Sequence, residues 1–409
     1  MTTLGEARAM DAADALAPLR ARFAAPEGLI YLDGNSLGML PADSVAASAD
    51  MVTRQWGERL IRSWNEGWID APARIGGLIA PLVGAAVDEV IACDSTSVNL
   101  FKLIVAGLRD AGRRDPKRRV VVSEAGNFPT DLHIAAGAVG CVAGAELRVV
   151  PRERLAEALG DDTALLLLTH VHYKSGARFD MAAWTARAQA AGALMLWDLS
   201  HSAGAVAVDL NAAGADLAVG CGYKYLNGGP GAPAFLFVAK RWQAALANPL
   251  SGWMGHAAPF GFADGYVPAD GIKRWLTGTP PMLAMGALEV GLRLWQGADL
   301  TAIGAKSAAL FDILLAAGTR AGLECVTPRD PAARGSHISF RHPEAHAIVQ
   351  ALIARDIVGD FRAPDVARFG LTPLTLSHEQ VWRAGEALVD VIATGAWDRA
   401  EYRARAAVT

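Results

Sequence analysis

Cysteine is scarce in this sequence, and patterns of metal ligands are lacking. Its 409 residues include 4 cysteines, and these lie far apart without a CxxC pair: Cys93, Cys141, Cys221 and Cys325. No histidine cluster has the spacing of metal ligands either. Such usage is typical of a chain that stays in a reducing compartment and holds no structural zinc. We therefore expect a cytoplasmic protein with no metal site.

The sequence also lacks a dominant charge and a long apolar run. It has 38 basic and 42 acidic residues, and only the short stretch 113–119 concentrates basic side chains. A nucleic-acid partner is therefore not expected. The apolar windows Ile75–Val87 and Ile134–Ala145 are too short or too rich in Gly and Ala to span a membrane, which takes about 20 residues. The N-terminus has no continuous apolar segment typical of a secretory signal.

The length and composition predict a packed protein of more than one domain. The chain is 52% hydrophobic and 20% charged, as in ordinary globular proteins. Because a single core stops growing near roughly 250–300 residues, we expect a large domain and a smaller one. The expected parts are an N-terminal segment that packs with the small domain (1–50), a large domain (51–299) and a small C-terminal α+β domain (300–409).

Short aliphatic runs alternate with Ala-rich helical stretches between about residues 94 and 239. The runs expected as strands are Val120–Ser123, Leu147–Val150, Ala164–Thr169, Ala193–Trp197, Leu217–Val219 and Ala234–Val238. This alternation predicts an α/β fold with a mainly parallel sheet sandwiched by helices. Ligands of open α/β sheets bind beyond the carboxyl ends of the strands. We therefore expect Thr169, Asp198 and the segment after Gly220 to meet in one crevice.

A lysine follows one of these runs. Lys224 lies in GCGYKYLNGG, which begins at Gly220. An amine among apolar and aromatic neighbours has a lowered pKa, and a neutral amine can form a Schiff base with an aldehyde. Taken alone, however, a lysine in a turn is more often a solvated surface charge. Lys224 indicates a cofactor site only in combination with other motifs, above all Asp198.

Asp198 ends a buried apolar run about one βα unit before the lysine. A carboxylate there can keep the ring nitrogen of pyridoxal 5'-phosphate (PLP) protonated, which this cofactor needs to act as an electron sink. The alternative is that Asp198 only caps the next helix. Its pairing with Lys224 favours the PLP interpretation.

Two further motifs fit the same cofactor. Ser95, Thr96 and Ser97 precede a helical run, where free backbone N–H groups and the helix dipole favour an anion such as a phosphate. An ordinary N-cap is the commoner explanation of such hydroxyls. The run NFPTD, from Asn127 to Asp131, offers a flat aromatic ring and a nearby acid.

Two more runs carry a resemblance to a known family: YLDGNSLG, from Tyr31, and SGWMG, from Ser251. With the motifs above they closely resemble kynureninase, a fold-type-I PLP enzyme of the aminotransferase class-V superfamily. The resemblance covers nearly the whole chain. The PLP elements recur across the superfamily, whereas LDGNSLG and GWMG are more specific to this family.

The resemblance implies a homodimeric hydrolase of tryptophan catabolism that cleaves the Cβ–Cγ bond of L-kynurenine to give anthranilate and L-alanine. It implies that Lys224 carries PLP as an aldimine in the large domain and that Asp198 pairs with the pyridinium nitrogen. Tyr223 is our candidate donor to the developing oxyanion. The other residues expected at the cofactor are Thr96, Ser97, Phe128, Pro129, Thr130, Asp131, Thr169, His201, Trp253 and Thr279. In the family the last two approach from the neighbouring subunit, so shared active sites are implied.

An arginine late in the chain holds the substrate carboxylate in this family, and Arg362 and Arg368 are the candidates here. We favour Arg368 because it follows a Pro-x-x-x spacer that begins at Pro364. A surface ion pair with Asp365 is the alternative for this arginine. The other expected substrate contacts are Asn35, Ser36 and Trp64.

Two positions bear on the preferred form of the substrate. Some animal members have asparagine at the position of Thr279 and a histidine near Trp64, which are associated with 3-hydroxykynurenine. This sequence departs from both features. The departure favours L-kynurenine and leaves the 3-hydroxylated form open.

Other functions fit the sequence less well. A class-V cysteine desulfurase or aminotransferase is the main alternative, but a desulfurase needs a reactive cysteine on a mobile loop. Cys325 lies in a run that predicts a strand. A PLP-binding regulator would need a DNA-binding helix-turn-helix, for which there is no room before Tyr31. A nicotinamide dehydrogenase would need GxGxxG, whereas GCG at Gly220 is followed by Tyr-Lys-Tyr.

Overall fold

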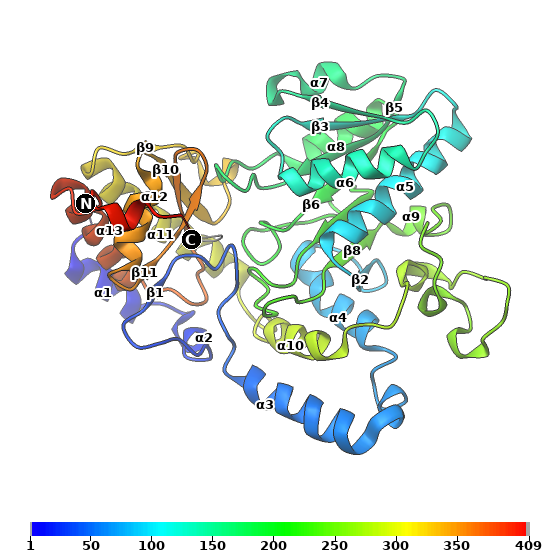
Figure 1. The fold of residues 1–409 in the computed structure, drawn as a ribbon, viewed down its shortest axis with the longest axis horizontal. Helices are drawn as coiled ribbons and strands as arrows, with labels where there is room; N and C mark the ends of the chain where they lie inside the picture. Colours follow the sequence, from blue (N-terminus) through cyan, green and yellow to red (C-terminus); the bar gives the residue numbers. More distant parts are fainter. Residues whose placement is uncertain (1, 406–409) are drawn as a thin grey trace.

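The computed structural model describes residues 2–405. Residue 1 of the predicted N-terminal segment and residues 406–409 of the predicted C-terminal domain lie outside the described residues. The chain forms a larger and a smaller unit that lie side by side (Figure 1).

The larger unit is built on a seven-stranded mixed sheet. Its strands, in spatial order, are β2 (Val90–Ala92), β8 (Phe235–Val238), β7 (Leu217–Gly220), β6 (Leu194–Asp198), β5 (Thr163–Thr169), β3 (Val120–Glu124) and β4 (Glu146–Val150). β8 runs antiparallel to both of its neighbours, and the pairs from β7 to β4 are parallel. The predicted mainly parallel α/β sheet is confirmed. The six predicted strands match to within one residue at each end, and only β2 was not predicted.

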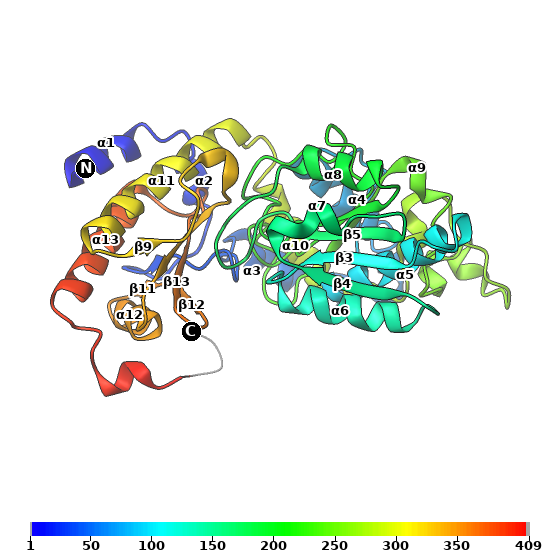
Figure 2. The same cartoon turned by 90° about the horizontal axis from the view of Figure 1, so that it is seen from above.

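Helices cover both faces of this sheet, with α6 and α8 on opposite sides (Figure 2). The helices of this unit are α4 (Ala71–Ile79), α5 (Thr96–Arg114), α6 (Pro129–Gly140), α7 (Leu155–Ala158), α8 (Met181–Ala190), α9 (Lys240–Gln243) and α10 (Met282–Arg293).

Strand β5 explains why the sheet is buried on both sides. Its side chains alternate between two hydrophobic clusters, so that Leu166 and Leu168 join one cluster while Leu165 and Leu167 join the other. A strand with two buried faces needs apolar residues at every position, which the run of leucines supplies. Such a strand is a rigid support for the polar residue at its end, Thr169.

The smaller unit contains a four-stranded antiparallel sheet with helices packed against it. Its strands, in spatial order, are β12 (Asp360–Arg362), β13 (Val366–Gly370), β10 (His337–Arg341) and β9 (Glu324–Cys325), and its helices are α11 (Leu300–Arg320), α12 (Ala345–Ile353) and α13 (His378–Ala393). A separate hydrophobic cluster forms its core, with Phe311, Phe340 and Phe369 at its centre. α11 passes the length and composition test for a membrane span, but it packs along α13 in this core.

The N-terminal segment contacts both units. α1 (Leu4–Ala12) packs on α13, and β1 (Ile30–Tyr31) pairs with β11 (Ile357–Val358) of the smaller unit. α3 (Asp43–Asp50) instead packs on α10 of the larger unit. The expectation for residues 1–50 named the small domain, whereas α3 packs on the larger unit. The reason is that α3 continues directly into a π-helix, Met51–Arg59, whose first residue packs against Gly286 of α10.

Candidate active site

The carboxyl ends of neighbouring parallel strands bring the predicted polar residues together. Thr169 and Asp198 are the last residues of β5 and β6 and are register partners. β7, beside β6, ends at Gly220, four residues before Lys224. Ligands of open α/β sheets bind at this edge. The sheet therefore supports one polar site built from three adjacent strands.

Lys224 is buried at this edge, with 9% of its surface exposed. Its Nζ lies 3.1 Å from Nε2 of His201 and 5.8 and 5.7 Å from the ring centroids of Phe128 and Tyr223. Burial, followed by the charge of Lys224, holds the pKa of His201 well below its ordinary value. The imidazole is therefore neutral and can accept a hydrogen bond from the lysine. The solvated surface lysine considered above does not fit this environment.

Gly38 of the N-terminal segment fixes the turn that carries Lys224. Its N–H donates to the carbonyl of Tyr223 at 2.7 Å, and a Cβ at position 38 would overlap the carbonyl oxygen of Lys224. Asn227, three residues after Lys224, has a positive φ of 56° and turns the chain back. The final glycine of YLDGNSLG is thus needed for close packing against the lysine turn.

Two carboxyl groups, those of Asp131 and Asp198, lie buried beside this lysine. Burial and then the charge of Asp198 raise the pKa of Asp131 well above its ordinary value. The Thr169 hydroxyl lies 3.1 Å from Oδ2 of Asp131 and also contacts Oδ1 of Asn127. Oδ1 of Asp198 accepts from the N–H of Ser200 at 2.8 Å. Two adjacent buried acids favour the binding of a ligand with a positively charged N–H group.

A cavity of about 430 Å³ opens beside Tyr223 at the start of α5. Its lining residues are Asp94, Ser95, Thr96, Cys221, Tyr223, Gly231, Ala232, Pro233, Ala234 and Pro281. Ser95 is the N-cap, and its hydroxyl accepts from the N–H of Val98. Thr96 and Ser97, in the first turn, are not used as that cap. Helix N-termini favour anions, so this end of the cavity suits a phosphate.

Lys102 offsets the negative charge of Asp94, which would otherwise repel an anion in this cavity. Asp94 lines the cavity and would repel a phosphate, but its carboxylate lies 2.6 Å from Nζ of Lys102. Lys102 is completely buried and also donates to the carbonyl of Trp275 at 2.8 Å. The Asp94 charge is therefore neutralised from the protein side.

Arg368 lies on β13 with 1% of its surface exposed. Its Nε donates to Oδ1 of Asp360 at 2.8 Å and its Nη2 to Oδ2 of the same residue. Nη2 also donates to Ser36 Oγ at 2.8 Å, and Nη1 donates to the carbonyl of Tyr173. When the side-chain amide of Asn35 is turned so that its oxygen faces Arg368, that oxygen accepts a hydrogen bond from Nε at 3.0 Å. Arg368 therefore joins the N-terminal segment, the larger unit and the smaller unit.

The alternative for Arg368, a surface ion pair with Asp365, is wrong. Asp365 lies just before β13, and its carboxylate is 3.3 Å from Nε of Arg341 on the neighbouring strand β10. Arg362, the other candidate, is half-buried on the edge strand β12 and shares Asp360 at 2.6 Å.

Comparison with known proteins gives the family of the chain. Residues 303–388 match the family model described as the kynureninase C-terminal domain. Proteins named kynureninase from Burkholderia mallei and Pseudomonas fluorescens are 52% and 47% identical to the chain, and each alignment covers 100% of both sequences. The chain belongs to the kynureninase family.

Solved structures give the same fold for this kynureninase-family chain. A cysteine desulfurase from Thermococcus onnurineus NA1 has a TM-score of 0.77 at 17% identity, covering 92% of this chain and 98% of that one. A C-DES variant with glycine covalently linked to the PLP cofactor has a TM-score of 0.77 at 20% identity, covering 91% and 99%. The fold is therefore that of the class-V PLP enzymes.

The predicted site residues Trp64 and Trp253 lie together but apart from the contacts of Lys224. Their ring centroids are 6.2 Å apart, and both rings contact Phe260. Thr279 is exposed in the loop before α10. Within residues 2–405, none of these residues is among the hydrogen-bond or ring partners of Lys224. Pro129 and Thr130 form the first turn of α6 between Phe128 and Asp131.

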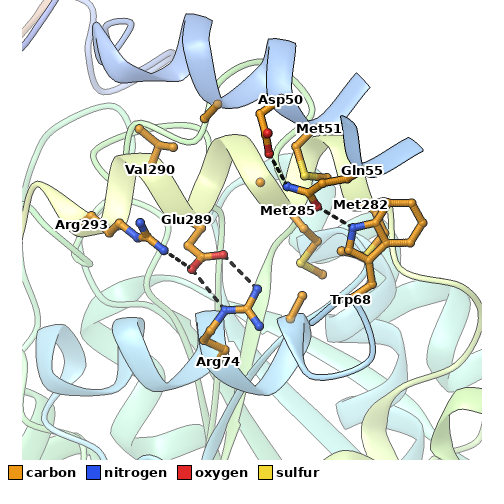
Figure 3. A pocket seen from close by; sticks show the side chains of 13 residues that line it. Asp50, Met51, Gln55, Trp68, Arg74, Met282, Met285, Glu289, Val290 and Arg293 are labelled. Carbon is orange, nitrogen blue, oxygen red and sulfur yellow. Dashed lines mark hydrogen bonds and ion pairs between the residues drawn. The ribbon is translucent and has the colours of Figure 1, made fainter. Parts of the chain in front are cut away.

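A second cavity, of about 190 Å³, lies between α3, the π-helix, α4 and α10 (Figure 3). Its charged groups pair with one another: Glu289 binds Arg74 at 3.1 Å and Arg293 at 2.8 Å. Gln55 donates to Asp50 and accepts from Trp68, both at 2.8 Å. None of the predicted site residues lines it, and it leaves no charge free for a reaction.

The four cysteines give no support to a desulfurase. Burial raises the pKa of the Cys93, Cys221 and Cys325 thiols, so these thiols are poor nucleophiles at neutral pH. Cys141 is exposed but follows the last residue of α6. The predicted site lies at the opposite end of that helix, roughly 18 Å away.

The sequence did not reveal two groups of the site. Asp360 binds Arg368 through the pairing of β12 with β13, and only its place two residues before an arginine could have indicated it. The carbonyl of Tyr173 is a backbone group, which leaves no signature in the sequence.

Proposed function

We propose that this protein is a PLP-dependent hydrolase that cleaves L-kynurenine and water to anthranilate and L-alanine, the reaction implied by its family. The observation that carries the proposal is the buried amine of Lys224, 3.1 Å from His201 and facing the acid pair Asp131 and Asp198. The full-length identity to proteins named kynureninase supports the same reaction. Whether the 3-hydroxylated substrate is also cleaved is a question for the assay below.

The residues present fit PLP at each part of the cofactor. Lys224 offers a desolvated amine for the aldehyde, and Asp198 with Asp131 offers negative charge for a protonated ring nitrogen. Phe128 offers an aromatic face for stacking, and Thr169 and His201 would contact the cofactor ring. Thr96, Ser97 and the start of α5 offer N–H and hydroxyl donors to the phosphate. When bound, PLP supplies an electron sink for the carbon next to the substrate amine.

Lys224 and His201 would handle the first proton. With PLP and substrate bound, Nζ of Lys224 would be the base that removes the proton from the substrate Cα. Because His201 is neutral, its Nε2 can accept a hydrogen bond and hold the ammonium group that results. Cβ–Cγ cleavage then requires water at the γ-carbonyl, so Nζ must keep its position while that water enters.

Tyr223 is the candidate donor to the oxygen of the attacked carbonyl. Burial raises the pKa of its hydroxyl above the ordinary value, so the group stays protonated at neutral pH and can donate. A donor placed in advance in a dry site typically lowers the activation barrier by about 3–4 kcal/mol. Tyr223 also lines the cavity at the start of α5, where contact with the phosphate end is the alternative role.

Arg368 is the proposed grip for the substrate carboxylate, because a guanidinium can bind a carboxylate by two parallel hydrogen bonds. Asn35 and Ser36 hold this guanidinium from the N-terminal segment. Trp64, whose ring lies beside that of Trp253, would line the path of the substrate ring in the site that Trp253 completes. The substrate amine and carboxylate would thus be held by the two units from opposite sides.

The proposal includes a cytoplasmic homodimer with shared active sites. Trp253 and Thr279 would complete the site of the neighbouring subunit. The exposed loop at Thr279 and the exposed rings of Phe260 and Phe262, which are 50% and 76% exposed, support a partner at this face.

The test follows anthranilate fluorescence after the purified PLP-loaded protein is mixed with L-kynurenine and, separately, with 3-hydroxykynurenine. We expect anthranilate from L-kynurenine, and a loaded protein that forms none would refute the substrate. Lys224→Ala should abolish turnover and the absorption band of the bound cofactor. Lys240→Ala is the matched control, because Lys240 is exposed and its side-chain nitrogen pairs with the surface carboxylate of Asp88.

A further inference from the structure

A fully buried histidine of the smaller unit, His337, lies beside the histidine that contacts Lys224. None of its surface is exposed. Its ring centroid lies 5.7 Å from that of His201, and the two ring planes are inclined at 62°. His337 is the first residue of β10, whereas His201 follows β6 of the larger unit. The proposed reaction uses His201 but not His337.

Strand register places His337 on the same side of the small sheet as Arg368. On β10, Ser339 is the register partner of Arg368, and His337 is the partner of Gly370. Side chains two residues apart on a strand point to the same face, so His337 shares a face with Ser339 and Arg368. Gly370 has no side chain that could bond to the imidazole, and a Cβ there would overlap the side-chain oxygen of Asn35. The imidazole is therefore turned toward the candidate site and faces no side chain from its partner strand.

Three nitrogens of the two imidazoles are buried without a partner. Within residues 2–405, neither Nδ1 nor Nε2 of His337 has a hydrogen bond, and Nδ1 of His201 has none either. Gly176 brings backbone close to one of them, since a Cβ added there would lie 3.2 Å from Nε2 of His337. Buried polar groups without a partner are destabilising, and native proteins contain few of them. The three nitrogens therefore point to a small bound molecule.

The chemistry of these nitrogens favours water over an anion or a metal ion. Burial lowers the pKa of both imidazoles well below the ordinary value, so both rings are neutral and carry no charge to hold an anion. A zinc ion takes about 3 or 4 protein ligands, and the part of the chain that the structure describes has no group of three side chains that could hold a metal. A buried water donates and accepts, and it needs about 2–4 polar partners.

The contact with Lys224 sets the direction of such a link. A neutral imidazole has one N–H donor and one bare nitrogen. When Nε2 of His201 accepts from Lys224, Nε2 is the bare nitrogen and Nδ1 carries the proton. The position of the proton in a histidine is determined by the hydrogen bond that the other nitrogen makes. An acceptor beside Nδ1 therefore stabilises the tautomer that can accept from the lysine.

We propose that one buried water molecule links Nδ1 of His201 to an imidazole nitrogen of His337. His337 is then a positioning residue. Through the water it keeps the proton of His201 on Nδ1 and leaves Nε2 open to Lys224. The inference rests on the proposed function only for the use of Lys224 as the base, because the water and the tautomer do not depend on the substrate.

Two replacements of His337 separate this role from simple packing. His337→Gln keeps a hydrogen-bond donor and an acceptor, whereas His337→Phe keeps an aromatic ring without nitrogens. The proposal predicts that the glutamine variant resembles the wild type and the phenylalanine variant does not, and a packing role predicts the reverse. His342→Phe is the matched control, because His342 directly follows β10 and its ring contacts Trp397 rather than His201.

Nitrogen-15 NMR of the histidine rings measures the tautomer in the PLP-free full-length protein, in which Lys224 carries a free amine. The chain has 9 histidines, and the signals of His201 are identified by their loss in His201→Asn. The ratio of the Nδ1–H form to the Nε2–H form should fall about fivefold in His337→Phe, as for the loss of one hydrogen bond. It should stay as in the wild type in His337→Gln and His342→Phe. An unchanged ratio in His337→Phe overturns the proposal.

A high-resolution crystal structure of the PLP-loaded wild type tests the water without any variant. We expect density within hydrogen-bonding distance of Nδ1 of His201 and of one nitrogen of His337. A direct bond between the two imidazoles, a bound ion or no density there would each overturn the proposal.

Steady-state kinetics with L-kynurenine give the consequence for the reaction. His337→Phe should lower kcat about fivefold and leave KM unchanged, because the variant alters the partner of Lys224 and not the carboxylate site. A raised KM with unchanged kcat would contradict the positioning role. A failure of the proposed function looks different, since the wild type would then release no anthranilate while the water and the tautomer ratio are still found as expected.

Discussion

The side-chain nitrogen of Lys224 lies 3.1 Å from Nε2 of His201, and the two groups are buried together. Nδ1 of the same imidazole has no hydrogen-bond partner among residues 2–405. The histidine thus directs one nitrogen to the lysine, and its other nitrogen is the one proposed to bind the water shared with His337. Its position depends on packing and on these two links.

Replacing His201 with alanine should therefore slow the reaction without removing it. One neutral hydrogen bond contributes about 1 kcal/mol, so we expect kcat for anthranilate formation to fall by about fivefold. Steady-state kinetics with L-kynurenine measure this. His256→Ala serves as the control, because His256 lies outside the site and bonds to the carbonyl of Gly265. An unchanged kcat in His201→Ala would contradict the role of the histidine.

The acid pair should respond unequally to replacement by asparagine. Because the raised pKa of Asp131 favours its neutral form, an amide resembles the group already present, and Asp131→Asn should keep activity within about tenfold of wild type. Asp198→Asn removes the charge proposed for the ring nitrogen and should lower kcat by about a hundredfold or more. Kinetics and the PLP dissociation constant of both variants check this, and equal losses would contradict the division of roles.

The two arginines that share Asp360 should differ in their effect on substrate binding. Arg368→Lys replaces a bidentate donor with a point charge, and we expect KM for L-kynurenine to rise by about a hundredfold. Arg362→Lys should raise KM by no more than about tenfold, because Arg362 lies half-buried on the edge strand and is screened by solvent. A larger effect at Arg362 would move the carboxylate grip to that residue.

Gly38 should tolerate no side chain. A Cβ there would overlap the carbonyl oxygen of Lys224, so Gly38→Ala should lower the free energy of unfolding by about 1–3 kcal/mol and reduce turnover. Gly137→Ala is the control, because this helical glycine has no atom within 4 Å of an added Cβ, and alanine should be neutral or stabilising by up to about 1 kcal/mol. Urea unfolding of both variants measures the difference.

Acid should destabilise the fold partly through His170. Burial and then the charge of Arg178 lower the pKa of this histidine from 6.5 to about 3, so the folded state holds it neutral. Its contribution to stability is complete above 6.5 and decreases as the pH falls toward 3, because only the unfolded chain binds the proton in that range. His170→Asn should reduce the loss of the urea midpoint between about pH 7 and pH 5. A loss equal to that of wild type would exclude His170 as a cause.

The sequence predicted the strands of the large sheet well because most of them are short, mainly apolar runs that end in or precede polar residues. β2 was missed because three residues, Val90–Ala92, carry too little pattern. The reversed direction of β8 depends on its pairing with β2 and β7, which local sequence does not encode. In the site, Asp198 is the last residue of β6 and Lys224 comes four residues after β7. Both positions were predictable because they lie at the ends of apolar runs. The hold of Asp360 on Arg368 arises from cross-strand register and was not.

Residues 35–38 reach both ends of the candidate site. Gly38 is bonded to the backbone beside the lysine, and Ser36 is bonded to the guanidinium of Arg368. In the proposed function, this short stretch would fix the distance between the amine site at Lys224 and the carboxylate site at Arg368. Residues 35–38, rather than the sheet, would then select α-amino acids over longer homologues.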